Sequence, residues 1–144
     1  MSAMKNVLVP VDGSDCAGRA VRWVSSVLAG LSGARVHLAH VRPAVDAWEV
    51  RSHLGADDIA TIQTAASAAV LTPAAAVVRE AGLPVETHAA VGDVATEIAA
   101  LVRTLSCDAI VMGTRGLGPV QSLLLGSTAM KVIHLADVPV TLIK

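Results

Sequence analysis

The 144 residues include 11 basic and 12 acidic side chains, a formal net charge of −1, and 53% of them are hydrophobic while 16% are charged. This length fits one domain that buries its own core, and the composition excludes an intrinsically disordered chain. The small net charge and the absence of a Lys/Arg block argue against nucleic acid and anionic membranes as partners. Polar residues interrupt every apolar stretch before about 18 residues, so we expect a cytoplasmic protein with no membrane span.

Short runs rich in β-branched residues alternate with segments of helical period, which predicts an α/β fold with a parallel sheet. The first strand is expected at 7–11, where nearly every residue is apolar. Apolar residues spaced from Ala17 to Leu31 predict the first helix, and Gly33 is expected to follow its end. The second strand is expected at 36–41.

An irregular stretch at 43–55 contains Trp48 and is the best candidate for an insertion or lid. Helical period returns at 57–81, but Pro73 lacks the backbone N–H that a helix interior needs. Thr72 and Pro73 are typical of an N-cap and first helical position, so this helix is expected to kink or restart there. The remaining expected elements are helices at 94–105 and 126–135 and strands at 85–91, 109–112 and 138–143.

The resulting βαβαβαβαβ pattern predicts a three-layer, doubly wound open sheet of five parallel strands in a single domain, 1–144. In such folds ligands bind beyond the carboxyl ends of the strands, where the strand order reverses. The loops after Val11, Val41, Val91 and Met112 are therefore the expected site of function.

A glycine-rich loop follows the fourth strand. Gly113, Gly116, Gly126 and Ser127 fit the spacing G-x-x-G-x9-G-[S/T]. Glycines leave backbone N–H groups unobstructed, and a helix N-terminus with small hydroxyl groups favours a phosphate. Arg115 adds a forked cation within the loop. The alternative is that the glycines only form a tight turn.

These residues resemble the universal stress protein family. The resemblance rests on VLVPVDGS at 7–14, His40-Val41, VGD at 91–93, VMGTRG at 111–116, LLLGS at 123–127 and VPVTLIK at 138–144. It covers nearly the whole chain and is weakest at 43–81. It implies the strand order 3-2-1-4-5 and a homodimer. In the subgroup with this glycine spacing it also implies binding of ATP, with or without Mg²⁺.

The resemblance also implies roles for individual residues. Near adenosine it places Pro10, Val11 and Asp12, with backbone groups of Val41 at the adenine edge. Met112 ends the strand that leads into the phosphate loop. The phosphates are expected at Gly113, Arg115, Gly116, Gly126, Ser127 and Thr128. For Asp12 the alternative is a simple N-cap of the first helix.

Other polar residues are expected to have structural roles. The five histidines never fall at HxxxH or HxH spacing, so no zinc site is expected. Lys131 is expected on the solvated face of the last helix, with a phosphate contact as the alternative. Cys16 and Cys107 are expected as small buried hydrophobes, with the Cys16 thiol pKa lowered at a helix start.

Three functions remain open from the sequence. The first is an ATP-binding regulatory protein of the stress response, with no catalytic residues. The second is a slow ATPase or self-phosphorylating enzyme using Ser127 or Thr128, for which Asp12 and Arg115 are the available groups. The third is a nucleotide-free interaction module. The apolar strand at 138–143 is expected at a sheet edge and predicts a homodimer through that strand.

Overall fold

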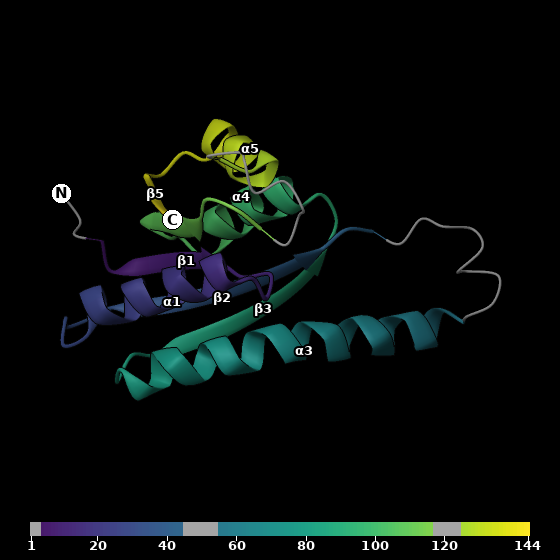
Figure 1. Ribbon diagram of the computed structural model, residues 1–144, viewed down its shortest axis with the longest axis horizontal. Helices are drawn as coiled ribbons and strands as arrows, with labels where there is room; N and C mark the ends of the chain where they lie inside the picture. The colour runs from purple at the N-terminus through teal and green to yellow at the C-terminus, as the bar shows by residue number, and fades with distance from the viewer. Residues whose placement is uncertain (1–3, 45–54, 117–124) are drawn as a thin grey trace.

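The computed structural model describes residues 4–44, 55–116 and 125–144, and it has five strands and four helices in this part of the chain (Figure 1). The elements in chain order are β1 (Asn6–Pro10), α1 (Asp15–Leu28), β2 (Arg35–Arg42), α3 (Ala56–Glu80), β3 (Val85–Val91), α4 (Val94–Thr104), β4 (Ala109–Gly113), α5 (Ser127–Leu135) and β5 (Val140–Ile143). Trp48 and most of the irregular stretch expected at 43–55 lie outside the described residues.

The strands form one parallel sheet in the order β3-β2-β1-β4-β5, which confirms the predicted architecture. Strand β1 pairs with β2 along its whole length, from Asn6 opposite Arg35 to Pro10 opposite Ala39. Its other neighbour, β4, pairs over only Val7 with Ala109 and Leu8 with Ile110. The order reverses at β1, so the topological switch point lies between β1 and β4.

Helices cover both faces of the sheet, as the nearly continuous apolar strands require. On one face α1 and α3 pack on side chains such as Val9 and Leu38. On the other face α4 and α5 pack on Leu8, Ile110 and Met112. Figure 1 shows α4 and α5 on one side of the strands and α3 on the other. The two cores are aliphatic, because the chain has no Phe or Tyr.

The ends of α1 differ from the expectation in two places. Ser14 is the N-cap, and its side chain accepts a hydrogen bond from the Ala17 amide, so the N-cap role considered for Asp12 is wrong. The helix ends at Leu28. Gly30, with φ +77°, lies in the left-handed region just past this end, in place of Gly33. Leu31 fits the apolar spacing of the helix in the sequence. In the structure it lies beyond Gly30 and outside the helix.

Helix α3 runs through Pro73 without restarting. Proline removes one donor, which would have bonded the carbonyl of Ala69 four residues earlier. Pro73 and Ala69 are both exposed, so water can satisfy the freed carbonyl. The restart is therefore wrong and the kink stays a prediction, because the proline lies on the solvent side, where the loss of one helical bond is tolerated.

Over Thr61–Glu80, α3 is long and apolar enough on average to meet the length and composition criteria for a membrane span. Gln63, Ser67 and Thr72 interrupt this stretch, as expected from the sequence. Within the fold, α3 places Leu71, Ala75 and Val78 in the core that it shares with α1 and the sheet. The helix thus has an apolar partner inside the domain.

The buried centre of β2 provides a test of this core. Leu38 has no exposed surface, whereas Leu31 is 41% exposed. We expect Leu38→Ala to lower the free energy of unfolding by about 2–5 kcal/mol, because it removes packed methyl groups and leaves a cavity. Leu31→Ala should cost less than about 0.5 kcal/mol. Urea unfolding of both variants measures the difference, and equal losses would contradict this packing.

Candidate functional site

Pairing between β1 and β4 ends after two residue pairs. Beyond Leu8 and Ile110 the two strands follow their other neighbours. The Val11 amide donates to the Ala39 carbonyl at 2.8 Å, which holds the end of β1 to β2, and the Thr114 amide donates to the Ile143 carbonyl at 2.9 Å, which holds the end of β4 to β5. The two strands therefore part at the carboxyl edge of the sheet, where the strand order predicts a ligand.

Asp12 lies in the loop between β1 and α1, at the carboxyl edge of the sheet. Its Oδ1 accepts a hydrogen bond from the Ser14 amide at 2.9 Å, and Gly13 between them has φ +86°. This local bond fixes the carboxylate in a turn. A Cβ built on Gly116 would lie only 2.8 Å from Oδ2 of Asp12. The loop after β4 therefore meets Asp12 at a residue that has no side chain.

Gly113 allows the start of α1 to approach β4 closely. A Cβ at this position would lie 2.8 Å from Sγ of Cys16 and 3.1 Å from the Cys16 backbone carbon. Even alanine would therefore force the backbone of α1 or β4 to move. The glycine of the sequence motif has a packing role here as well as any role toward a ligand.

The two ends of the loop between β4 and α5 lie close together. The Gly126 amide donates to the Thr114 carbonyl at 2.6 Å, so the two ends of the loop are joined. Gly126 is the N-cap of α5, and the N-terminus of this helix has no side-chain cap. Ser127 and Thr128 in its first turn are exposed. Residues 117–124, including Pro119 and Gln121, lie outside the described part of the chain.

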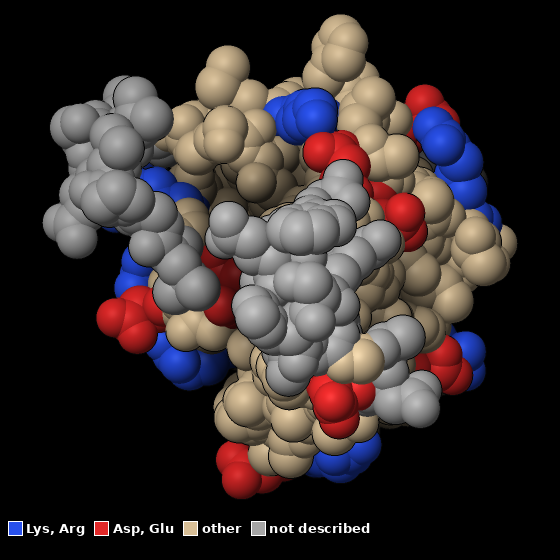
Figure 2. Space-filling view, turned by 90° about the vertical axis from the view of Figure 1, so that its right-hand side faces the viewer, with Lys and Arg blue, Asp and Glu red and all other residues tan. Residues whose placement is uncertain are grey.

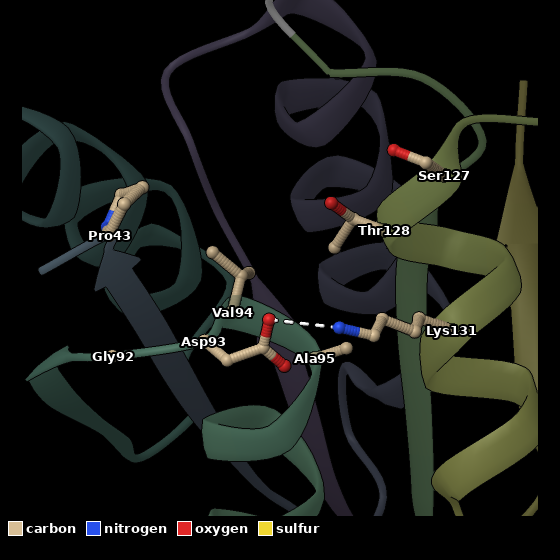
Figure 3. Close-up of a pocket in the computed structure, with 8 residues that line it drawn as sticks. All are labelled: Pro43, Gly92, Asp93, Val94, Ala95, Ser127, Thr128 and Lys131. Carbon is tan, nitrogen blue, oxygen red and sulfur yellow. Dashed lines mark hydrogen bonds and ion pairs between the residues drawn. The ribbon is translucent and has the colours of Figure 1, made fainter.

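A cavity of about 340 Å³ lies beside this helix end. Figure 3 shows its lining, which consists of Pro43, Gly92, Asp93, Val94, Ala95, Ser127, Thr128 and Lys131. The first turns of α4 and α5 both border it. Such a volume lies at the lower end of the range for small-molecule sites.

An ion pair joins the two helices at this cavity. Nζ of Lys131 lies 3.0 Å from Oδ1 of Asp93 (Figure 3). Oδ2 of Asp93 accepts from the Thr96 hydroxyl at 2.6 Å and from the Thr96 amide at 3.2 Å, which makes Asp93 the N-cap of α4. The Thr96 hydroxyl, followed by Lys131 and the Thr96 amide, lowers the Asp93 pKa to about 2. The carboxylate is thus charged and already paired.

The structure separates the predicted site residues into groups. Asp12, Gly113 and Gly116 lie together where β1 and β4 part, and Gly126 joins them through Thr114. Ser127 and Thr128 line the cavity beside α5. The remaining residues are Pro10, Val11, Val41, Met112 and Arg115, which lie at the carboxyl ends of β1, β2 and β4 and do not line that cavity.

Two cavity residues were not recognised as site residues in the sequence. Asp93 follows β3 and directly precedes a helical run, which is an N-cap signal. Lys131 was expected on a solvated face, and it is exposed, but its ammonium group reaches across to Asp93. The sequence could indicate the cap, whereas the pairing depends on how α4 and α5 pack.

Figure 2 shows this end of the molecule, with Lys and Arg side chains interspersed with Asp and Glu around the described surface. A field of one sign would attract an oppositely charged ligand over a distance. Because the charges here are mixed, ligand recognition at this end would depend on local groups, such as the uncapped N-terminus of α5.

The two cysteines are buried and free, as expected. The Cys16 thiol donates to the Ile143 carbonyl at 3.1 Å. Burial raises its pKa, but hydrogen bonds from the Arg115 backbone and from Thr114 outweigh burial, so the net pKa is lowered. For Cys107, burial and then the charge of Asp108 raise the pKa to about 11.

The fold and the residues at its topological switch point define a doubly wound α/β protein with a candidate ligand site at the carboxyl edge of the sheet. The model of the universal stress protein family matches residues 4–144, and the chain belongs to this family. A universal stress protein of Thermus aquaticus is 33% identical over 97% of this chain and 98% of its own length.

Two solved structures are similar over nearly the whole chain. Hypothetical protein MJ0577 has a TM-score of 0.81 and 25% identity, covering 99% of this chain and 97% of its own. The Archaeoglobus fulgidus universal stress protein in complex with dAMP has a TM-score of 0.70 and 26% identity, with both chains fully covered. A family relative of the same fold therefore holds an adenine nucleotide.

The contrast between the two thiols predicts their reactivity. At pH 8 a thiol of pKa about 11 is about 0.1% thiolate, so Cys107 should alkylate at least about tenfold more slowly than Cys16. Mass spectrometry after timed iodoacetamide treatment of the native protein measures both rates. The Cys107→Ser variant isolates the Cys16 rate. Equal rates would contradict the opposite pKa shifts, since both residues are similarly buried.

Proposed function

We propose that this protein is a regulatory universal stress protein that binds an adenine nucleotide, ATP with its Mg²⁺, in the crevice between β1 and β4. The observation that carries the proposal is the joined glycine loop: the hydrogen bond from Gly126 to Thr114 places the uncapped N-terminus of α5 beside the switch point. The dAMP complex of the Archaeoglobus fulgidus relative supports the same ligand class.

The phosphates would bind at the start of α5. Its first backbone N–H groups have no side-chain acceptor, and the helix dipole favours an anion there. The hydroxyl groups of Ser127 and Thr128 would add donors, and Arg115 and the glycines Gly113 and Gly116 would complete the loop. Asp93 would not repel the phosphates strongly, because Lys131 neutralises it.

The adenosine would bind at the ends of β1 and β2. Pro10, Val11 and Met112 offer apolar surface at the carboxyl ends of the strands, and Val41 offers backbone groups to the adenine edge. Asp12 is already oriented by the Ser14 amide, so its second oxygen can accept a hydrogen bond from a ribose hydroxyl.

Thr114 would connect nucleotide binding to the rest of the protein. Its carbonyl holds Gly126 at the start of α5, while its amide holds Ile143 in the edge strand β5. A ligand that shifts Thr114 would therefore also shift the edge strand β5. This connection favours a regulatory role, in which nucleotide binding changes the protein surface at β5. Catalysis is less favoured, because the resemblance leaves only Asp12 as a base and places it at the adenosine end.

The nucleotide site can be tested by denaturing freshly purified protein, chromatographing the supernatant, and titrating the washed protein with Mg-ATP in a calorimeter. We expect adenine nucleotide in the supernatant or saturable binding in the titration. The Gly116→Val, Gly126→Val double variant should weaken binding at least about tenfold, because the new side chains would meet Asp12 Oδ2 and the Thr114 carbonyl.

A matched control is the Gly30→Val, Gly82→Val double variant. Both glycines have positive φ and open space around them, so valine strains the backbone without filling the crevice. This variant should lose stability but keep its affinity. No binding by the wild type at millimolar Mg-ATP would refute the proposal. Formation of ADP, or of phosphate on Ser127 or Thr128, would instead establish the enzymatic alternative.

We also propose that two copies associate through β5. This strand pairs only with β4 in the described sheet. The carbonyls of Pro139 and Ile143 accept hydrogen bonds from the β4 side. By strand alternation the backbone groups of Val140 and Leu142 face outward, where a second copy of β5 can pair with them.

A backbone substitution separates pairing from packing. Leu142→Pro removes an outward donor, and we expect it to shift the protein from dimer to monomer in light scattering coupled to size exclusion. Leu142→Ala loses the same side-chain packing on the α4 and α5 face but keeps the donor, and it should remain dimeric. A dimeric, folded Leu142→Pro variant would contradict the proposed interface.

A further inference from the structure

Three metal-ligating side chains meet on β2 and β3, away from the crevice. The register places His37 of β2 opposite Glu86 of β3. Glu86 and His88 are two residues apart, so both project from the same face of β3. They share the sheet face of α4, because neighbouring Leu38 belongs to the core on the opposite face. Spacing rules for zinc ligands within one element could not reveal this set, since Glu86 lies 49 positions after His37.

The donor atoms of these residues are close enough to share one ion. Nδ1 of His37 lies 3.0 Å from Nε2 of His88 and 3.4 Å from Oε2 of Glu86, and Nε2 of His88 lies 3.9 Å from Oε2. A point equidistant from the corners of a triangle with these sides lies about 2.0 Å from each corner. Zn–N and Zn–O bonds are about 2.0–2.2 Å long.

His37 is the buried member of this set. Its side chain is only 3% exposed, and its polar contacts within the described chain are to His88 and Glu86. A neutral imidazole offers a lone pair on one ring nitrogen to a metal ion.

We propose that His37, Glu86 and His88 form a binding site for a divalent transition-metal ion, Zn²⁺. Two imidazole nitrogens and one carboxylate suit zinc, whereas Mg²⁺ and Ca²⁺ prefer oxygen ligands. Three protein ligands leave a fourth position for water or another ligand. That position faces solvent, because Glu86 is 58% and His88 21% exposed.

The site would be independent of the nucleotide. His37 is the third residue of β2, and the crevice lies beyond the other end of this strand. The five residue steps from His37 to Arg42 span about 16 Å. Loss of the metal should leave nucleotide affinity unchanged, so the two proposals can fail separately.

The test uses full-length protein without a histidine tag, stripped with a chelator and titrated with Zn²⁺ against a chromophoric indicator. We expect one equivalent per chain. Glu86→Gln and His88→Gln should each weaken binding at least about tenfold. Both residues are partly exposed, and circular dichroism checks that the variants fold. Co²⁺ should give the visible absorption of a tetrahedral site in the wild type and lose it in His88→Gln.

The matched control is His134→Gln, which removes an exposed imidazole on α5. Wild-type affinity in this control, with loss in the two ligand variants, supports the site. No stoichiometric Zn²⁺ binding by the wild type would overturn the proposal and leave His37 and His88 as a hydrogen-bonded pair. Undiminished binding in His88→Gln, or an equal loss in His134→Gln, would also overturn it.

Discussion

The brevity of the β1–β4 pairing is the constraint on which the functional end of this molecule depends. Two residue pairs hold these strands together before each turns to its other neighbour, β1 through Val11 and Ala39 and β4 through Thr114 and Ile143. A parallel sheet that kept pairing here would have no crevice. Because the strand order reverses at this point, the loops after β1 and β4 lead to helices on opposite faces of the sheet, and the two loops meet at Asp12 and Gly116.

Small residues then determine how closely the segments around the crevice approach. Gly113 lets Cys16 at the start of α1 lie against the end of β4, and Gly116 lets the loop pass beside Asp12. At Gly113 a methyl group would meet the backbone of Cys16, and at Gly116 it would displace the Asp12 carboxylate. The glycines of the motif therefore have two roles. They allow neighbouring segments of the protein to pack closely, and they leave backbone N–H groups accessible to an anion.

The two ends of the sheet have different chemistry. The carboxyl edge offers backbone amides, hydroxyl groups and an ion pair between Asp93 and Lys131, which suits a phosphate-bearing ligand. Nearer the amino end of β2, His37 meets a carboxylate and a second imidazole from β3, which suits a borderline metal ion. The same rigid sheet positions both sets, so each is held without help from the other.

The sequence by itself determined the alternation of strands and helices, the doubly wound class and the glycine spacing, because these depend on local periodicity and on residues close in the chain. Family resemblance supplied the strand order, which the structure confirmed. Only the tertiary structure decided that α3 continues through Pro73, that Lys131 reaches Asp93, and that His37 meets Glu86 and His88. These outcomes depend on strand register and on which side of a helix meets solvent. Those quantities are set by contacts between residues far apart in the chain, which local sequence patterns do not encode.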